Sequence, residues 1–139
     1  PTGKCRTCSA PALNTADLEA VSLTNEVDMT AAVAAGVIIV AVEADRPAFQ
    51  DYTAGVLGAA NCGERVNHVA TVVGYNGVGR SDPSNPFYWI MQNSWGMSWG
   101  MEGYILLEKG DVDTCGIYTA AMSIQAKSAN STNSKIQLK

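Results

Sequence analysis

The sequence predicts an α+β fold, in which short helices accompany a mainly antiparallel, barrel-like arrangement of β-strands. Its 139 residues, 47% of them hydrophobic, are enough to bury one core in a single domain. The pattern changes near residue 66, where helix-forming segments give way to β-branched and aromatic segments that turns separate. This succession of strands fits either a meander or a barrel.

The first predicted helix spans residues 26–35, and Ala and Met fill its interior. Thr24 or Asn25 can cap its start through a side-chain oxygen. Gly36 suits its end, because glycine readily adopts the left-handed conformation that closes many helices.

The apolar run VIIVAVE at residues 37–43 is rich in β-branched residues and is typical of a strand buried on both faces. Pro47 follows it and suits the first turn of a second short helix. We expect the Gly-, Asn- and Pro-rich stretch 76–86 to be an exposed loop and the charged stretch 108–113 to be a solvated turn. Four further strands are expected within segments 66–75, 87–93, 103–109 and 116–124.

Charge and hydropathy argue against two classes of partner. The formal net charge is −4, so we expect no nucleic acid to bind. The longest apolar run, residues 37–42, is far shorter than the ~20 residues that cross a bilayer, so we expect no membrane association. The N-terminal residues do not show a basic region followed by an apolar one, so the sequence predicts no targeting segment.

Four cysteines stand at positions 5, 8, 62 and 115, each beside turn-forming or polar residues. An even number in this setting favours disulfides and an oxidising compartment. Cys5 and Cys8 also have the spacing of a zinc or redox pair, but no second such pair follows and the histidine is distant. We therefore expect no metal and no other cofactor.

His68 is the only histidine, and it lies on a strand of otherwise apolar character. A single histidine in such a run is commonly structural. An imidazole that acts as a base, however, needs one ring nitrogen free and the other held by an acceptor. The amide oxygen of Asn93 could be that acceptor if two antiparallel strands place the residues side by side, and a tryptophan of the following turn could shield the bond from water.

Around these residues the sequence resembles the C-terminal half of papain-like, cathepsin-type cysteine proteases of family C1. The resemblance rests on VNHVATVVGY at 66–75, YWIMQNSWGMSWGMEGYILLEKG at 88–110 and CGIY at 115–118. It extends from about residue 25 to residue 123 and implies the right-hand, mainly antiparallel β-barrel-like domain of the papain-like fold.

The resemblance also implies roles for individual residues. His68 would be the general base and the imidazolium partner of a cysteine thiolate, and Asn93 would orient its ring. Trp95 would cover the bond between them and, with Trp99, border the leaving-group side of the cleft. Cys62 and Cys115 match the disulfide of the family within this half. The other substrate-binding residues that it implies are Ala41, Val66, Asn67, Val69 and Ala120.

Four of these residues would line the pocket for the second residue before the scissile bond. No acidic residue falls at Ala120, at the base of the pocket, so we expect an aliphatic or aromatic side chain there and not a basic one. Val69 departs from the family, which usually has Ala or Gly after the histidine, and its extra methyls should narrow the pocket. The four residues are Ala41, Val66, Val69 and Ala120.

The nucleophile of the family is missing from this chain. The family places its cysteine near the mature N-terminus in a Cys-Gly-Ser/Ala-Cys-Trp/Tyr setting, and no cysteine here has that context. The resemblance therefore implies an absent N-terminal half, to which Cys5 or Cys8 would be bridged. Alone, the chain should be inactive, because a His and an Asn without a thiolate cannot form an acyl-enzyme.

Three interpretations follow. The favoured one is the C-terminal chain or a fragment of a papain-like cysteine endopeptidase. The second is a non-catalytic papain-like relative with a structural, inhibitory or binding role. The third is an unrelated β-domain in which His68, Asn93 and the tryptophans are packing residues.

In the favoured interpretation, residues 1–24 link to the N-terminal half, residues 25–126 form the C-terminal domain, and residues 127–139 are a polar tail with a candidate N-glycosylation acceptor at Asn130. The expected partners are the N-terminal half with the catalytic cysteine, peptide substrates, and propeptides or cystatin-like inhibitors. The expected location is lysosomal, vacuolar or secreted.

Overall fold

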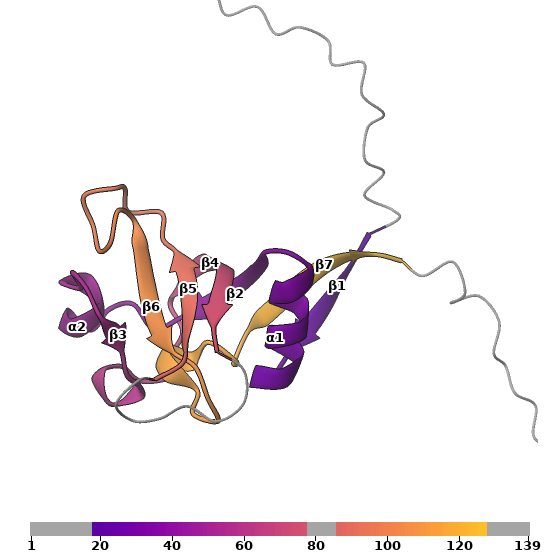
Figure 1. The fold of residues 1–139 in the computed structure, drawn as a ribbon, viewed down its shortest axis with the longest axis horizontal. Coiled ribbons are helices and arrows are strands. Elements are labelled where there is room, and N and C mark those ends of the chain that lie inside the picture. Colours follow the sequence, from indigo (N-terminus) through magenta and orange to yellow (C-terminus); the bar gives the residue numbers. More distant parts are fainter. Residues whose placement is uncertain (1–17, 78–85, 128–139) are drawn as a thin grey trace, which may run out of the picture.

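The computed structural model describes residues 18–77 and 86–127 and folds them into a mixed sheet with a few short helices (Figure 1). Its strands are β1 (Leu18–Leu23), β2 (Ile38–Val42), β3 (Val56–Leu57), β4 (His68–Asn76), β5 (Tyr88–Gln92), β6 (Tyr104–Glu108) and β7 (Ala121–Ala126). Its helices are α1 (Glu26–Ala35) and α2 (Pro47–Gln50), with single 3-10 turns at Ala59–Asn61 and Thr114–Gly116.

The strands lie in the order β1-β7-β2-β4-β5-β6-β3, and every pairing is antiparallel except that of β3 with β6. Strands β4, β5 and β6 follow one another as a meander. The sheet is open, with β1 and β3 at its edges, so the α+β class is confirmed and the term barrel-like applies only loosely. Figure 1 shows α1 beside the β1 and β7 end of the sheet and α2 at the other end.

Helix α1 has the bounds that the sequence predicts. Asn25 caps it, since its Oδ1 accepts a hydrogen bond of 2.9 Å from the backbone N–H of Asp28. Gly36 follows its last turn with φ 168°, an extended conformation and not the expected left-handed one. The helix packs against β2 and β4 and buries Met29 and Val33 there.

The prediction that β2 is buried on both faces is wrong for this chain. Its even-numbered residues are buried, whereas Ile39 is 40% exposed and Ala41 is partly exposed. The pairing register explains the alternation, because Ile39 and Ala41 lie opposite Thr71 and Val69 of β4 on the face away from the core. The β-branched run therefore reflects strand propensity here and not burial on both sides.

Strand β1 is not among the predicted elements. It pairs with β7 over six positions, from Leu18 opposite Ala126 to Leu23 opposite Ala121. Strand β7 itself begins later than segment 116–124 predicts, because a 3-10 turn precedes it, with Cys115 at φ 57° and Gly116 at φ 75°. Residues 18–23 thus belong to the sheet.

The prediction of a solvated turn at residues 108–113 is wrong for Lys109, because this residue is only 1% exposed. Its ammonium forms an ion pair with the carboxylate of Glu26 in the first turn of α1. A buried cation needs such a partner. The ammonium also lies over three aromatic rings, at 5.2 Å from the centroid of Trp89, 5.6 Å from that of Tyr75 and 5.9 Å from that of Phe87.

A second buried polar group lies in the same region. The Tyr118 hydroxyl donates a hydrogen bond of 2.9 Å to the Gly110 carbonyl and accepts one of 3.3 Å from Nε1 of Trp89. Burial raises the pKa of Tyr118 to about 12, because it disfavours the phenolate.

Some predictions fall outside the described residues: those on Cys5, Cys8 and Asn130 and on most of the loop 76–86. In the part of the chain that the structure describes, no helix has the length and apolar character needed to cross a membrane.

Candidate active site

The antiparallel pairing of β4 with β5 brings His68 and Asn93 together. His68 is the first residue of β4 and Asn93 directly follows β5, while Thr71 lies opposite Gln92 in the register. The Nε2 atom of His68 is 2.8 Å from the Oδ1 atom of Asn93. The two candidate residues are thus in direct hydrogen-bond contact.

This contact defines the proton positions on the imidazole. The backbone N–H of Ser94 donates to the same Oδ1 of Asn93 at 2.8 Å, which supports the assignment of that atom as oxygen. An amide oxygen only accepts, so Nε2 of His68 carries the proton and Nδ1 of a neutral ring presents a lone pair. Within residues 18–77 and 86–127, Nδ1 has no hydrogen-bond partner.

A cluster of aromatic rings supports the histidine. The Trp95 ring centroid is 5.2 Å from that of His68 and 5.2 Å from that of Trp99. Phe49 of α2 contacts both tryptophans, at 5.7 Å from Trp95 and 5.5 Å from Trp99. Nε1 of Trp99 donates to the backbone carbonyl of Gln50 at 2.8 Å, which anchors the cluster to α2.

Phe49 was not singled out in the sequence. Phe49 is an aromatic residue close to Pro47 in the predicted second helix, which marks it as a candidate for burial. It stands 46 residues before Trp95, however, and nothing in the neighbouring sequence indicates a contact with the tryptophans. Phe49 is fully buried and packs against the core-facing side of the tryptophans, while Trp95 is 40% exposed.

The turn that carries the tryptophans is closed by its own backbone. The N–H of Asn93 donates to the Gly103 carbonyl at 2.9 Å, and the N–H of Gly103 donates to the Trp99 carbonyl at 2.8 Å. Gly100 has φ +59°, and a Cβ there would lie 2.5 Å from the Tyr104 carbonyl oxygen. Glycine is therefore required at this position for the turn to fold back on Asn93.

Three of the predicted pocket residues lie side by side. Ala41 is opposite Val69 in the β2–β4 register, and its N–H donates to the Ala120 carbonyl at 2.9 Å. Val69 is 62% exposed, so this apolar surface is open. Val66 has a separate neighbour, since a Cβ on Gly116 would lie 2.8 Å from its Cγ1.

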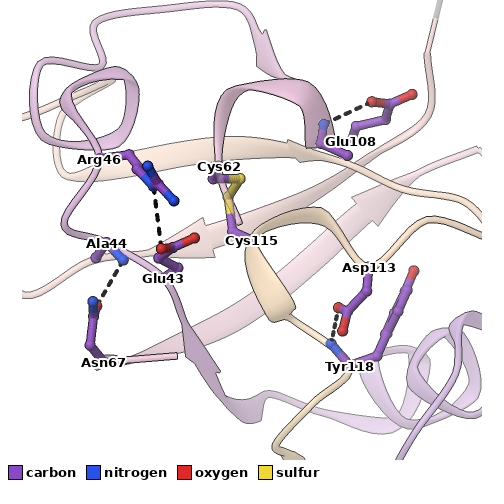
Figure 2. Close-up of a disulfide and its surroundings, with 10 residues drawn as sticks. Glu43, Ala44, Arg46, Cys62, Asn67, Glu108, Asp113, Cys115 and Tyr118 are labelled. Atoms are coloured by element: carbon purple, nitrogen blue, oxygen red, sulfur yellow. Dashed lines mark hydrogen bonds and ion pairs between the residues drawn. A yellow bond between two sulfur atoms is a disulfide. The ribbon is translucent and has the colours of Figure 1, made fainter. Parts of the chain in front are cut away.

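Asn67 holds the loop before α2 in place. Its Oδ1 accepts a hydrogen bond of 2.9 Å from the Ala44 N–H, and its own N–H donates to the Val42 carbonyl at 2.9 Å. Figure 2 shows Asn67 pointing at Ala44. This contact holds the segment before α2 beside His68.

The structure joins Cys62 to Cys115 in a disulfide, 53 positions apart in sequence, as the resemblance implies. Figure 2 shows Glu43 next to the bridge, between Arg46 and the sulfur atoms. Glu43 is only 2% exposed, and one oxygen is 3.3 Å from Nε of Arg46. The bridge connects the loop before β4 with the 3-10 turn before β7. The N–H of Glu43 donates to the Cys115 carbonyl at 2.8 Å and so joins that turn to the end of β2.

Comparison with known proteins defines the class. The model of the papain family of cysteine proteases matches residues 2–125, and the chain belongs to this family. It is 40% identical to procathepsin L of Rattus norvegicus over 94 residues, which are 67% of this chain and 28% of that protein. It is 38% identical to Testin-2 of Mus musculus over 123 residues, which are 87% of this chain and 37% of that protein.

Solved structures agree with the family assignment. The structure of bromelain from Ananas comosus in complex with the E64 inhibitor is similar with a TM-score of 0.66 and 36% sequence identity. That match covers 80% of this chain and 50% of the bromelain chain. The chain thus has a papain-like fold and spans only a part of each of these relatives.

Proposed function

We propose that this chain is part of a papain-like cysteine endopeptidase and supplies His68 and Asn93 to a nucleophilic cysteine on an N-terminal half. The observation that carries the proposal is the 2.8 Å hydrogen bond between Nε2 of His68 and Oδ1 of Asn93. It leaves the lone pair of Nδ1 available to a thiol, which is the arrangement that a general base needs.

The chemistry follows from that lone pair. The thiol of the N-terminal half transfers its proton to Nδ1 of His68, and the thiolate attacks the carbonyl carbon of the scissile peptide. The imidazolium then protonates the leaving amine nitrogen, and a thioester remains on the cysteine. In the second half-reaction His68 takes a proton from water and the hydroxide attacks the carbonyl carbon of the thioester. The C–S bond breaks, the carboxylic acid leaves, and the thiolate takes its proton back from His68.

Asn93 and Trp95 are positioning residues in this scheme. Asn93 fixes the imidazole through a neutral acceptor. It therefore adds no negative charge that would favour the imidazolium form of His68 over the neutral imidazole. The ring centroids of Trp95 and His68 are 5.2 Å apart, and Phe49 packs against Trp95. An apolar cover limits competition from water for the hydrogen bond between His68 and Asn93.

The open face of the sheet supports an N-terminal half as the partner. Ile39 and Met122 lie opposite each other in the β2–β7 register and are 40% and 37% exposed. Ile124, at 52%, extends the same face along β7. A contiguous apolar face of this kind suits burial against a second folded unit. Cys5 or Cys8 is our candidate for a disulfide to that unit.

The same face suggests the substrate preference. Ala41, Val69 and Ala120 form an apolar surface without a charged side chain, so we assign it to an aliphatic or a small aromatic residue two positions before the scissile bond. Val66, whose Cγ1 lies close to Gly116, is a further candidate. The methyl groups of Val69 narrow the site and disfavour the largest aromatic side chains.

The proposed setting is a lysosome, a vacuole or the extracellular space. The disulfide between Cys62 and Cys115 supports it, because such bridges persist in oxidising compartments. Propeptides and cystatin-like inhibitors are the proposed protein ligands of the assembled cleft.

The test is to label the assembled protein, with its N-terminal half, by an epoxide of the E64 type under mild reduction and to locate the label by mass spectrometry. We expect the label on a cysteine of the N-terminal half and none on this chain alone. His68→Ala should lower kcat/KM for a peptide substrate by about 10²–10⁴, and Asn93→Ala by about 10² through misplacement of the ring. Val112→Ser, an exposed apolar position outside the site, is the control.

A folded, assembled protein that takes no label and cleaves no peptide would refute the protease function. Binding of a propeptide or of a cystatin-like inhibitor without turnover would then favour the non-catalytic relative. Equal activity of the His68→Ala variant and the unmodified protein would refute the role of His68.

A further inference from the structure

The methionines of the chain differ in how far an oxidant can reach them. Their exposed fractions are 0% for Met29, 0% for Met91, 77% for Met97, 42% for Met101 and 37% for Met122. A peroxide oxidises a methionine whose thioether is accessible. Met97 and Met101 both lie within residues 94–103, which we call the tryptophan turn. The turn beside the candidate site therefore carries the two most exposed methionines.

The sulfur of Met101 contacts a buried hydroxyl, which distinguishes it from Met97. It lies 3.3 Å from the hydroxyl oxygen of Tyr52, a residue that is only 6% exposed. That hydroxyl donates to the Gly55 carbonyl at 2.6 Å and accepts from the Leu106 N–H at 3.3 Å. In the described part of the chain, Met97 has no polar contact of this kind. A change at the Met101 sulfur therefore acts on a hydroxyl that joins the segment after α2 to β6.

We propose that Met101 is a site of reversible oxidation by hydroperoxides, and that its sulfoxide draws the tryptophan turn away from Tyr52. The thioether sulfur attacks the outer oxygen of the hydroperoxide with a lone pair. The S–O bond forms, the O–O bond breaks, and the proton passes to the second oxygen, which leaves as water or an alcohol. The sulfur is oxidised and the peroxide is reduced. A thiol-dependent methionine sulfoxide reductase removes the oxygen again.

The sulfoxide changes the room that the Met101 side chain needs. Its oxygen is polar and can turn toward the Tyr52 hydroxyl, because methionine is unbranched and flexible. An O–H···O hydrogen bond is about 2.7 Å long, and the S–O bond adds to that length. The sulfur then cannot stay 3.3 Å from the hydroxyl oxygen. We expect Met101 to move outward and the Gly55 carbonyl to lose its donor.

Ring contacts carry this displacement to the imidazole. Trp99, two residues before Met101, has its ring centroid 5.8 Å from that of Tyr52. The Trp99 centroid is 5.2 Å from that of Trp95, which is 5.2 Å from that of His68. Oxidation of Met101 thus loosens the aromatic cover of the imidazole. Only its effect on peptide cleavage rests on the proposed protease function.

The test uses the assembled protein, with its nucleophilic cysteine first blocked as a mixed disulfide that mild reduction removes after treatment with hydrogen peroxide. Peptide mapping by mass spectrometry follows each sulfoxide over time, together with tryptophan emission and kcat/KM for a peptide substrate. We expect Met97 to be oxidised first and without effect. The later oxidation of Met101 should shift the emission and lower kcat/KM about tenfold, a part of the ~10²-fold that a misplacement of about 1 Å can cost.

Met101→Leu and Met97→Leu are a matched pair of variants, because leucine has a similar volume and no sulfur. After the same treatment, the Met101→Leu variant should keep its emission and activity. The Met97→Leu variant should lose activity as the unmodified protein does. Sulfoxide reductase should restore both readouts in the unmodified protein.

Equal losses in the two leucine variants, or a Met101 sulfoxide that leaves the emission unchanged, would overturn the inference. So would the absence of a Met101 sulfoxide once Met97 is fully converted. A protein that cleaves no peptide and takes no epoxide label before oxidation fails the protease function alone. An emission shift that follows the Met101 sulfoxide would then support the oxidation site independently of cleavage.

Discussion

The buried ion pair between Lys109 and Glu26 gives a quantitative prediction about stability. The side chain of Lys109 is 0% exposed and that of Glu26 is 20% exposed. Glu26→Gln removes the negative charge and leaves a buried ammonium without an anionic partner. Breaking a buried pair in this way costs about 3–5 kcal/mol, a large share of the ~5–15 kcal/mol by which a typical domain is stable.

Lys109→Met should cost less, although it removes the same ion pair. Methionine fills a similar volume among the aromatic rings, and Glu26 remains partly exposed in the first turn of α1, where the helix dipole favours a carboxylate. We expect a loss of about 1–2 kcal/mol, mainly that of a charge-assisted hydrogen bond. The double variant should resemble Lys109→Met, because no buried charge is then left without a partner.

The assay is urea-induced unfolding of the three variants, followed by far-ultraviolet circular dichroism with tryptophan fluorescence as a second probe. The expected order of destabilisation is Glu26→Gln first, with Lys109→Met and the double variant well below it. The double-variant cycle should show a coupling of about 2 kcal/mol or more. Additive effects, or a larger loss for Lys109→Met than for Glu26→Gln, would refute the reasoning.

Three other predictions concern the loops. Replacing Cys62 and Cys115 by Ala should cost about 4 kcal/mol for a bridge between residues 53 apart, and a shift of the unfolding free energy below 1 kcal/mol would contradict the loop-entropy argument. Gly100→Ala should displace the tryptophan turn, because its Cβ would lie 2.5 Å from the Tyr104 carbonyl oxygen; an unchanged tryptophan emission spectrum with full activity would exclude this. The native state holds the Tyr118 proton up to a pKa of about 12, against an ordinary value of 10.0, so stability should fall as pH rises from 10 towards 12. Tyr118→Phe should reduce that fall in unfolding measurements between pH 9 and 12, and equal slopes would show that another group is responsible.

Helix α1 could be predicted to the residue because its signals are local. Asn25 caps the first turn through its neighbour Asp28, and Gly36 ends the helix. Strand β1 could not be predicted, because LEAVSL has few β-branched residues and becomes a strand through its pairing with β7, about a hundred residues later. Such pairing depends on tertiary context, which local propensity does not contain.

The candidate site divides in the same way. His68 and Asn93 were predicted as partners because their chemistry is complementary and their strands are neighbours in sequence. Phe49 and its contacts with the tryptophans escaped, since nothing in its local sequence ties it to the distant turn. The burial of Lys109 escaped as well, because its partner Glu26 is 83 residues away and its flanking residues are polar.

The pairing of β1 with β7 has a mechanical consequence. Leu18, where β1 begins, lies opposite Ala126, where β7 ends. A pulling force on these two points would therefore open the ladder one residue pair at a time, as a zipper opens, and would not shear six pairs at once. The sheet should yield at low force at this edge, while the strands that carry His68 and Asn93, which lie further along the strand order, stay paired.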